Sequence, residues 1–292
     1  MTAAAIIPLS MAWIGDVIPY QQRQPVLARF LIGQILGLSV GVLFGGFAAD
    51  LDNWRLPFYL VAVIFLGVSM ALFSLNRRLP EHARQVGLVE GLALRRMASE
   101  FLKVLANPWA RRVLLTVFLE GAFLYAAFAF IASHMYRIFG LSLAAAGALI
   151  VLYGMGGFVF ALASARMVRG LGEIGLVRWG GLLVTVSLAA IGIAPFWWWA
   201  IPACLVAGLG FYMLHNTLQI NATQMAPERR GAAVSTFSSC FFLGQSVGVG
   251  IAGLLVEHVG TSIIMLAGAC GVLAIALRFG AALKARAAED LS

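Results

Sequence analysis

The sequence predicts an all-α polytopic membrane protein, and three observations lead to this fold class. The chain is 62% hydrophobic and 11% charged, whereas a soluble domain carries about 25% charged residues. Its apolar residues form long, nearly continuous runs rather than the alternating segments of about ten residues that build a membrane β-barrel. Backbone polar groups in lipid have to be paired internally, and uninterrupted runs achieve this as helices.

Eight runs are long enough to cross the hydrocarbon layer of a bilayer, which takes about 20 residues. They are expected at 25–49, 56–75, 113–133, 141–165, 174–194, 198–221, 232–256 and 261–283. Residues 1–13 are apolar but too short to span the bilayer. They also lack the basic start and the cleavage site of a signal peptide. We therefore expect them to be the end of a truncated helix.

Lysine and arginine give the orientation of these spans. When successive loops are assigned alternately to the two sides of the membrane, one side collects sixteen basic residues and the other has Arg55 and Arg137. The rich side is expected to be cytoplasmic. The C-terminus and the central loop are therefore expected in the cytoplasm. Topology accounts for the net charge of +8, and no nucleic-acid partner is implied.

The pattern GQxxG occurs at 33–37 and again at 244–248, each time after a loop that contains proline and arginine. A repeat so far apart indicates two related halves, as in many transporters. We expect the remainder of a first half at 1–75, a six-helix half at 113–284 and a cytoplasmic tail at 285–292. The polar segment 76–112, amphipathic over 88–106, is expected to link the halves along the membrane surface. The first half is about three helices shorter than the second, so the chain is expected to lack an N-terminal part.

Three short motifs resemble those of the major facilitator superfamily, whose members have twelve helices in two halves. The segment 16–23 resembles the loop between helices 4 and 5. Trp54 and Arg55 open a WR-x-x-F sequence like that of helix 6, and Arg230 belongs to a P-E-x-R-G sequence like that before helix 11. The segment 210–219 is similar to bacterial sugar and drug efflux permeases, a resemblance that implies the inner membrane of a bacterial cell. The resemblance implies part of helix 4 and helices 5–12 of this fold, and secondary active transport by alternating access.

Glycines recur every four residues along the first full run, and one more follows the last of them. They are Gly33, Gly37, Gly41, Gly45 and Gly46. Such a stripe lets a second helix approach closely, and packing is the interpretation we favour. The stripe also resembles the superfamily's antiporter motif, G-x-x-x-G-P-x-x-G-G. Val42 stands where that motif has the proline that would bend the helix, so antiport is not established by this stripe alone.

Two ionisable side chains are expected inside the membrane. Glu120 lies about 12 Å beyond Arg112 along its helix, at 1.5 Å per residue. A carboxylate at this depth costs several kcal/mol, so it is expected to face a water-filled cavity or a partner. His215 lies at a comparable depth, and histidine exchanges protons near neutral pH. We interpret both as proton-coupling residues that face one cavity; hydrogen bonds that only stabilise packing are the alternative for each.

Tyr212, Asn216 and Gln219 form one polar stripe with His215 at helical spacing. Together with Tyr125 they are candidates for binding a substrate. Tyr153, Gln34 and Gln245 are weaker candidates, and the two glutamines are interpreted as a structural pair. No basic residue lies deep in a span, which favours a small neutral or cationic substrate over an anionic one. The cysteines lie in apolar runs without metal-site spacing, so neither a metal nor a cofactor is expected.

Three alternatives to transport are considered. The segments 37–41 and 244–248 match G-x-S-x-G, but a nucleophile in this motif needs a strand–turn–helix elbow. Both segments lie within predicted helices, so an enzyme is disfavoured. A truncated membrane protein that does not transport is the main alternative, because alternating access requires two halves that move against each other. A receptor or a channel is disfavoured, because the sequence predicts neither a soluble domain nor a filter-like loop.

Overall fold

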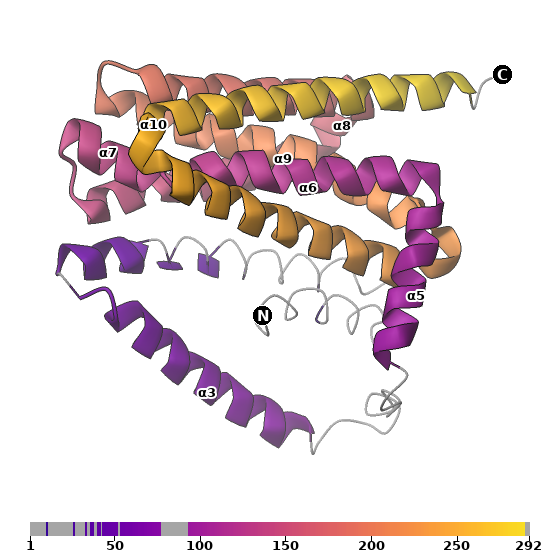
Figure 1. Cartoon of the computed structure of the whole chain (residues 1–292), viewed down its shortest axis with the longest axis horizontal. Helices are drawn as coiled ribbons and strands as arrows, with labels where there is room; N and C mark the ends of the chain where they lie inside the picture. The colour runs from indigo at the N-terminus through magenta and orange to yellow at the C-terminus, as the bar shows by residue number, and fades with distance from the viewer. Residues whose placement is uncertain are drawn as a thin grey trace.

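A computed structural model gives the arrangement of the helices (Figure 1). The structure describes residues 10, 26, 33, 36–37, 40–41, 43–51, 53–76 and 93–289. Within these residues the long elements are all α-helices and no strand occurs. The predicted all-α fold class is therefore confirmed. The loop at 16–23, Gln34 and Val42 lie outside the described residues.

Besides the helical residues 43–50, the described part of the chain has seven α-helices and two short 3₁₀ helices. The α-helices are α3 (Leu56–Asn76), α5 (Ala93–Ala106), α6 (Pro108–Phe128), α7 (Ile131–Phe139), α8 (Leu143–Ile193), α9 (Ala200–Gln224) and α10 (Arg230–Glu289). The 3₁₀ helices are η2 (Trp197–Trp199) and η3 (Pro227–Arg229). Five stretches within the described residues are long and apolar enough to cross a membrane.

Two of these stretches fold back on themselves at a glycine. Helix α8 has 51 residues and α10 has 60, whereas about 20 residues are enough to cross the hydrocarbon. Gly172 (φ 63°, ψ 179°) divides α8 and Gly260 (φ 80°, ψ 161°) divides α10. This backbone region is open essentially to glycine alone. The described part of the chain thus has seven crossings, which match seven predicted runs in order and place.

The remaining predicted run, 25–49, is described mainly over 43–49, where it is helical. The third predicted run begins earlier than expected, at Pro108, because Asn107 caps the helix there. The Asn107 side-chain oxygen accepts from the backbone N–H groups of Trp109 (2.8 Å) and Ala110 (3.4 Å). Its amide nitrogen donates to the carbonyl of Met225 (3.0 Å) at the end of α9. One side chain therefore satisfies orphan groups at two helix ends.

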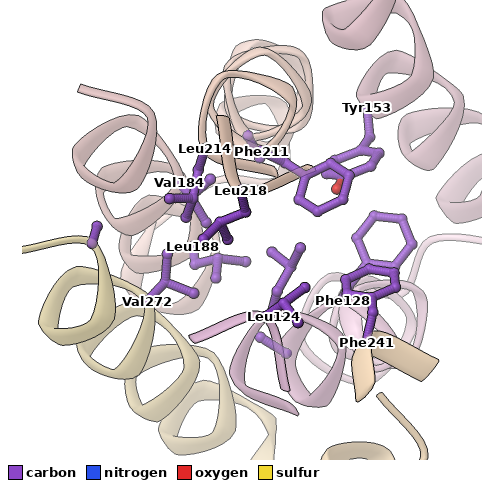
Figure 2. Packing of buried hydrophobic residues seen from close by; sticks show 14 of the residues in the cluster. Leu124, Phe128, Tyr153, Val184, Leu188, Phe211, Leu214, Leu218, Phe241 and Val272 are labelled. Carbon is purple, nitrogen blue, oxygen red and sulfur yellow. The ribbon is translucent and has the colours of Figure 1, made fainter. Parts of the chain in front are cut away.

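The core lies among α6, α8, α9 and α10 (Figure 2). It is built from large apolar side chains, including Leu124, Leu188, Leu214, Leu218 and Val272. Glycines let these helices pack backbone to backbone. A Cβ at Gly180 of α8 would lie 2.6 Å from the carbonyl oxygen of Gly210 on α9. Close packing through small residues is how helices associate in lipid, where burial of apolar surface contributes little.

Helix α3 lies apart from the other described helices (Figure 1) and is exposed along its length. Its apolar composition suits contact with lipid or other membrane segments. Helix α5 lies across one end of the bundle and forms the described part of the predicted amphipathic linker. Val104 anchors it, being 1% exposed. The predicted tail at 285–292 is helical up to Glu289, because α10 continues that far.

Candidate functional site

Glu120 and His215 meet inside the helical bundle. Nδ1 of His215 lies 2.8 Å from Oε2 of Glu120, so an ionised Glu120 can accept a hydrogen bond from Nδ1–H. The Glu120 side chain is 1% exposed and that of His215 is 17% exposed. The sequence placed both residues at a similar depth on different helices, and the structure brings them into contact. A buried carboxylate needs such a partner, since an unpaired charge in lipid costs several kcal/mol.

A close helix contact positions the Glu120–His215 pair. Gly121 follows Glu120 on α6, and a Cβ at Gly121 would lie 2.5 Å from the carbonyl oxygen of Phe241 on α10. Further along the same interface, a Cβ at Gly244 would overlap the carbonyl of Phe118. Helices α6 and α10 can therefore approach until their backbones touch. This approach places Phe241 of α10 next to the buried Glu120–His215 pair.

Aromatic rings surround the imidazole of His215. The Phe211 ring stacks on it with a centroid distance of 4.9 Å, and the Phe241 ring lies 4.6 Å away. The Phe237 ring, one turn before Phe241 on α10, lies 5.5 Å away. Such rings exclude water and hold the imidazole in one orientation toward Glu120. Their electron-rich faces also suit a cation, whether a protonated imidazole or part of a substrate.

Two buried oxygen atoms near this region lack a hydrogen-bond partner among the described residues. They are Oε1 of Glu120 and the hydroxyl of Tyr153. The Tyr153 ring packs between Phe128 (4.6 Å) and Phe211 (5.7 Å), as Figure 2 shows. Buried polar groups are usually satisfied. Both oxygens therefore retain an unused capacity for hydrogen bonding beside the Glu120–His215 pair.

Of the four predicted substrate-binding residues, the two tyrosines pack against neighbouring helices, whereas Asn216 and Gln219 are half-buried on α9. Tyr125 lies on α6 beside Phe241, with ring centroids 5.7 Å apart. Tyr212 packs its ring against Gly157 of α8, where a Cβ would overlap it. Asn216 and Gln219 are half-buried on α9, and within the described residues neither is hydrogen-bonded to the Glu120–His215 pair. A role of these four residues in binding stays a prediction.

The predicted glycine stripe has one close contact in the described structure. Around Gly33, Gly37, Gly41 and Gly45, no described atom lies within 4 Å of a built Cβ. Gly46 differs, because its Cβ would lie 2.5 Å from the carbonyl oxygen of Leu143 at the start of α8. The packing interpretation is therefore supported at Gly46. What lies along the rest of the stripe stays a prediction.

Two of the three family-motif residues, Trp54 and Arg55, pack against each other at the start of α3. Arg55 lies over the Trp54 ring, 4.7 Å from its centroid, and the Trp54 ring meets Phe58 edge to face at 6.1 Å. Together they form the corner that leads into α3. Arg230 is the first residue of α10, and its side chain lies outside the described part of the structure.

Sequence reasoning missed three polar contacts between distant segments. Asp50 accepts hydrogen bonds from the first two N–H groups of α8. Nδ1 of His134 lies 2.7 Å from the hydroxyl of Thr261, and both residues are buried. Arg137 forms an exposed ion pair with Glu257. Each residue lies near the end of a helix, which was the only sequence signal, and no local pattern indicates their partners.

The described helices define a multi-pass membrane protein, and comparison with known proteins gives its family. The family model described as Major Facilitator Superfamily matches residues 1–232. The chain belongs to this superfamily of membrane transporters, as the motifs indicated.

Two relatives are named for efflux. The chain is 30% identical over 231 residues to the multidrug efflux protein YfmO of Bacillus subtilis (strain 168), which covers 76% of the chain and 53% of that protein. It is 23% identical over 270 residues to a probable sugar efflux transporter of Pasteurella multocida (strain Pm70), covering 92% of the chain and 64% of that protein. The chain thus spans between about half and two thirds of the length of these relatives.

Proposed function

We propose that the chain forms part of a secondary active transporter that exports a small neutral or cationic molecule in exchange for protons. Membership of the superfamily supports transport by alternating access, and the relatives named for efflux support the direction. One observation carries the proton coupling: a buried carboxylate and an imidazole in direct contact at 2.8 Å.

The contact between Glu120 and His215 supports proton coupling. Two ionisable groups in contact share their protons, so the pair gains or loses a proton as a unit. With the pair singly protonated, Nδ1–H donates to the carboxylate. A second proton would neutralise Glu120 and leave a positive imidazole. The pair is neutral overall in the first state and positive in the second, so a cationic substrate would be favoured only in the first state and would compete with the second proton.

The surroundings of the pair support the substrate class. Phe211, Phe237 and Phe241 provide apolar, electron-rich faces, and Glu120 supplies the single acid. Such a site would hold a cation or a partly apolar neutral molecule and would disfavour an anion. The names of the relatives, one for multidrug and one for sugar efflux, fit either a cationic or a neutral molecule.

We propose an orientation in which the central linker and the C-terminus face the cytoplasm of a bacterial cell. The charge distribution supports this orientation, since sixteen basic residues lie in the loops of one side and only Arg55 and Arg137 in the loops of the other. Trp197, Trp198 and Trp199 are exposed on η2 at a turn between crossings. Tryptophans are enriched at the membrane–water interface, which fits their position.

Transport in proteoliposomes tests the proposal. The protein, expressed from its own gene with its native start, would be reconstituted and supplied with ethidium as a cationic probe and radiolabelled lactose as a neutral one. We expect an acidic lumen to drive accumulation of at least one probe, and nigericin, which collapses the pH gradient, to abolish it. His215→Ala should reduce this dependence on the gradient. A dependence that survived unchanged in both His215→Ala and Glu120→Gln would contradict proton coupling through the pair.

A further inference from the structure

Two side chains cap the first turn of α8, one adjacent to the helix in the sequence and one from a distant segment. Ser142, the residue before the helix, accepts from the N–H of Ala145 at 3.2 Å. Asp50 accepts from the N–H of Leu143 at 2.8 Å and from that of Ala144 at 3.0 Å, one bond to each carboxylate oxygen. A helix start leaves such N–H groups without partners inside the helix. Two of them therefore depend on a residue more than 90 positions earlier in the chain.

A second contact lies one helical turn before Asp50. A Cβ at Gly46 would lie 2.5 Å from the carbonyl oxygen of Leu143 and 3.0 Å from Cα of Ala144. Residues four apart share one face of a helix, so Gly46 and Asp50 present a single surface to the start of α8. The glycine lets the two backbones touch, and the aspartate supplies a negative charge to a helix end that carries partial positive charge.

These contacts join the two predicted halves of the transporter. Asp50 belongs to the segment before α3, and α8 belongs to the six-helix half. Helix α3 makes little contact with that half, so the described contact between the halves is concentrated at this point. In alternating access, each end of the molecule opens and closes in turn. A contact between halves at one end can exist only while that end is closed.

We propose that Asp50 and the first turn of α8 form a latch that holds this end of the transporter closed and opens in each transport cycle. The inference rests on the proposed function, because it assumes alternating access. On opening, water replaces the carboxylate at the N–H groups of Leu143 and Ala144. The latch therefore stabilises one state over the other, whereas the Ser142 cap is local to α8 and is the same in both states.

Distances between spin labels on the two halves test the latch. Labels would be attached at Asn53→Cys and Ile138→Cys, both exposed positions near the contact. The protein would be the full product of its own gene in lipid nanodiscs, with every native cysteine replaced by alanine. Double electron–electron resonance then gives the populations of short and long distances between the two labels. These populations correspond to the closed and open states of this end of the transporter.

Asp50→Asn is expected to raise the ratio of long to short distances about tenfold, which corresponds to about 1.4 kcal/mol. The amide keeps one acceptor oxygen but loses the charge. Gly46→Ala keeps the charge and pushes the backbones apart, so it should shift the ratio in the same direction. Ser142→Ala is the matched control, because it removes a cap of the same helix end without touching the other half. It should leave the ratio unchanged.

The latch would be overturned if both Asp50→Asn and Gly46→Ala gave the wild-type distance distribution, or if Ser142→Ala shifted it as much as they do. Ethidium and lactose transport, measured on the same preparations, separates this result from the proposed function. Transport by the wild type together with unchanged distances in both variants overturns the latch alone. The expected shift in a protein that moves neither probe supports the contact between halves and contradicts the proposed function.

Discussion

Replacing Glu120 by glutamine is expected to abolish accumulation of substrate against a gradient while leaving exchange across the membrane intact. Glutamine has nearly the shape of glutamate and can still hydrogen-bond His215, but it does not release a proton. The substituted site would bind substrate and alternate, yet no proton movement would accompany the cycle. Accumulation driven by an acidic lumen should fall to the level of liposomes without protein.

Exchange of labelled for unlabelled probe at equal concentrations on both sides measures the alternation without the driving force. Measured with lactose, the neutral probe, which needs no charge pairing with Glu120, this rate is expected to stay close to that of the wild type in Glu120→Gln. The matched control is Glu257→Gln, which removes an exposed carboxylate paired with Arg137 and should retain both activities. Full accumulation by Glu120→Gln would show that the carboxylate is not needed for coupling. Loss of exchange as well would assign Glu120 to binding or folding instead.

The second large effect is expected from Gly244→Ala, a change of a single methyl group. The new Cβ would overlap the carbonyl of Phe118, so α6 and α10 would have to move apart. Overpacking of this kind costs about 1–3 kcal/mol and sometimes more. The movement would also displace Phe241 from His215. We expect the unfolding temperature to fall by roughly 5 °C or more.

Gly250→Ala is the control for this substitution. Gly250 lies on the same helix, but nothing lies within 4 Å of its Cβ position. Alanine is the better helix former, so the unfolding temperature should stay the same or rise slightly. Thermal unfolding followed by tryptophan fluorescence, in one detergent and at one protein concentration, compares the two variants. Equal unfolding temperatures would contradict the packing of α6 against α10 through Gly244.

Much of the helical layout could be predicted from the sequence, because long apolar runs and charged loops alternate in it. The two positions where a long helix turns back, Gly172 and Gly260, both fall between predicted runs. The ends of helices were less predictable. The start of α6 at Pro108 depends on Asn107, whose amide reaches the end of α9, and such a contact between distant segments leaves no local pattern.

In the candidate site too, the residues with a local sequence signal could be predicted, whereas contacts between distant segments could not. Glu120 and His215 could be singled out, because an acid or a histidine within an apolar run is rare and costly. Their shared depth followed from counting residues along each helix. The rings of Phe211 and Phe241 around the imidazole could not be anticipated, since phenylalanine is common throughout such a chain. Asp50 escaped notice because an acid at the end of a span is ordinary until its partner is known.

Proton coupling requires that the Glu120–His215 pair takes up and releases protons under the conditions of transport. Infrared difference spectroscopy of the purified protein in lipid measures this directly, without a known substrate. Spectra of the wild type and of Glu120→Gln would be recorded from about pH 5 to about pH 8, the range in which histidine commonly titrates. We predict a carboxyl absorption in the wild type that changes across this range and is missing from Glu120→Gln. Identical pH-dependent spectra for the two proteins would contradict the claim.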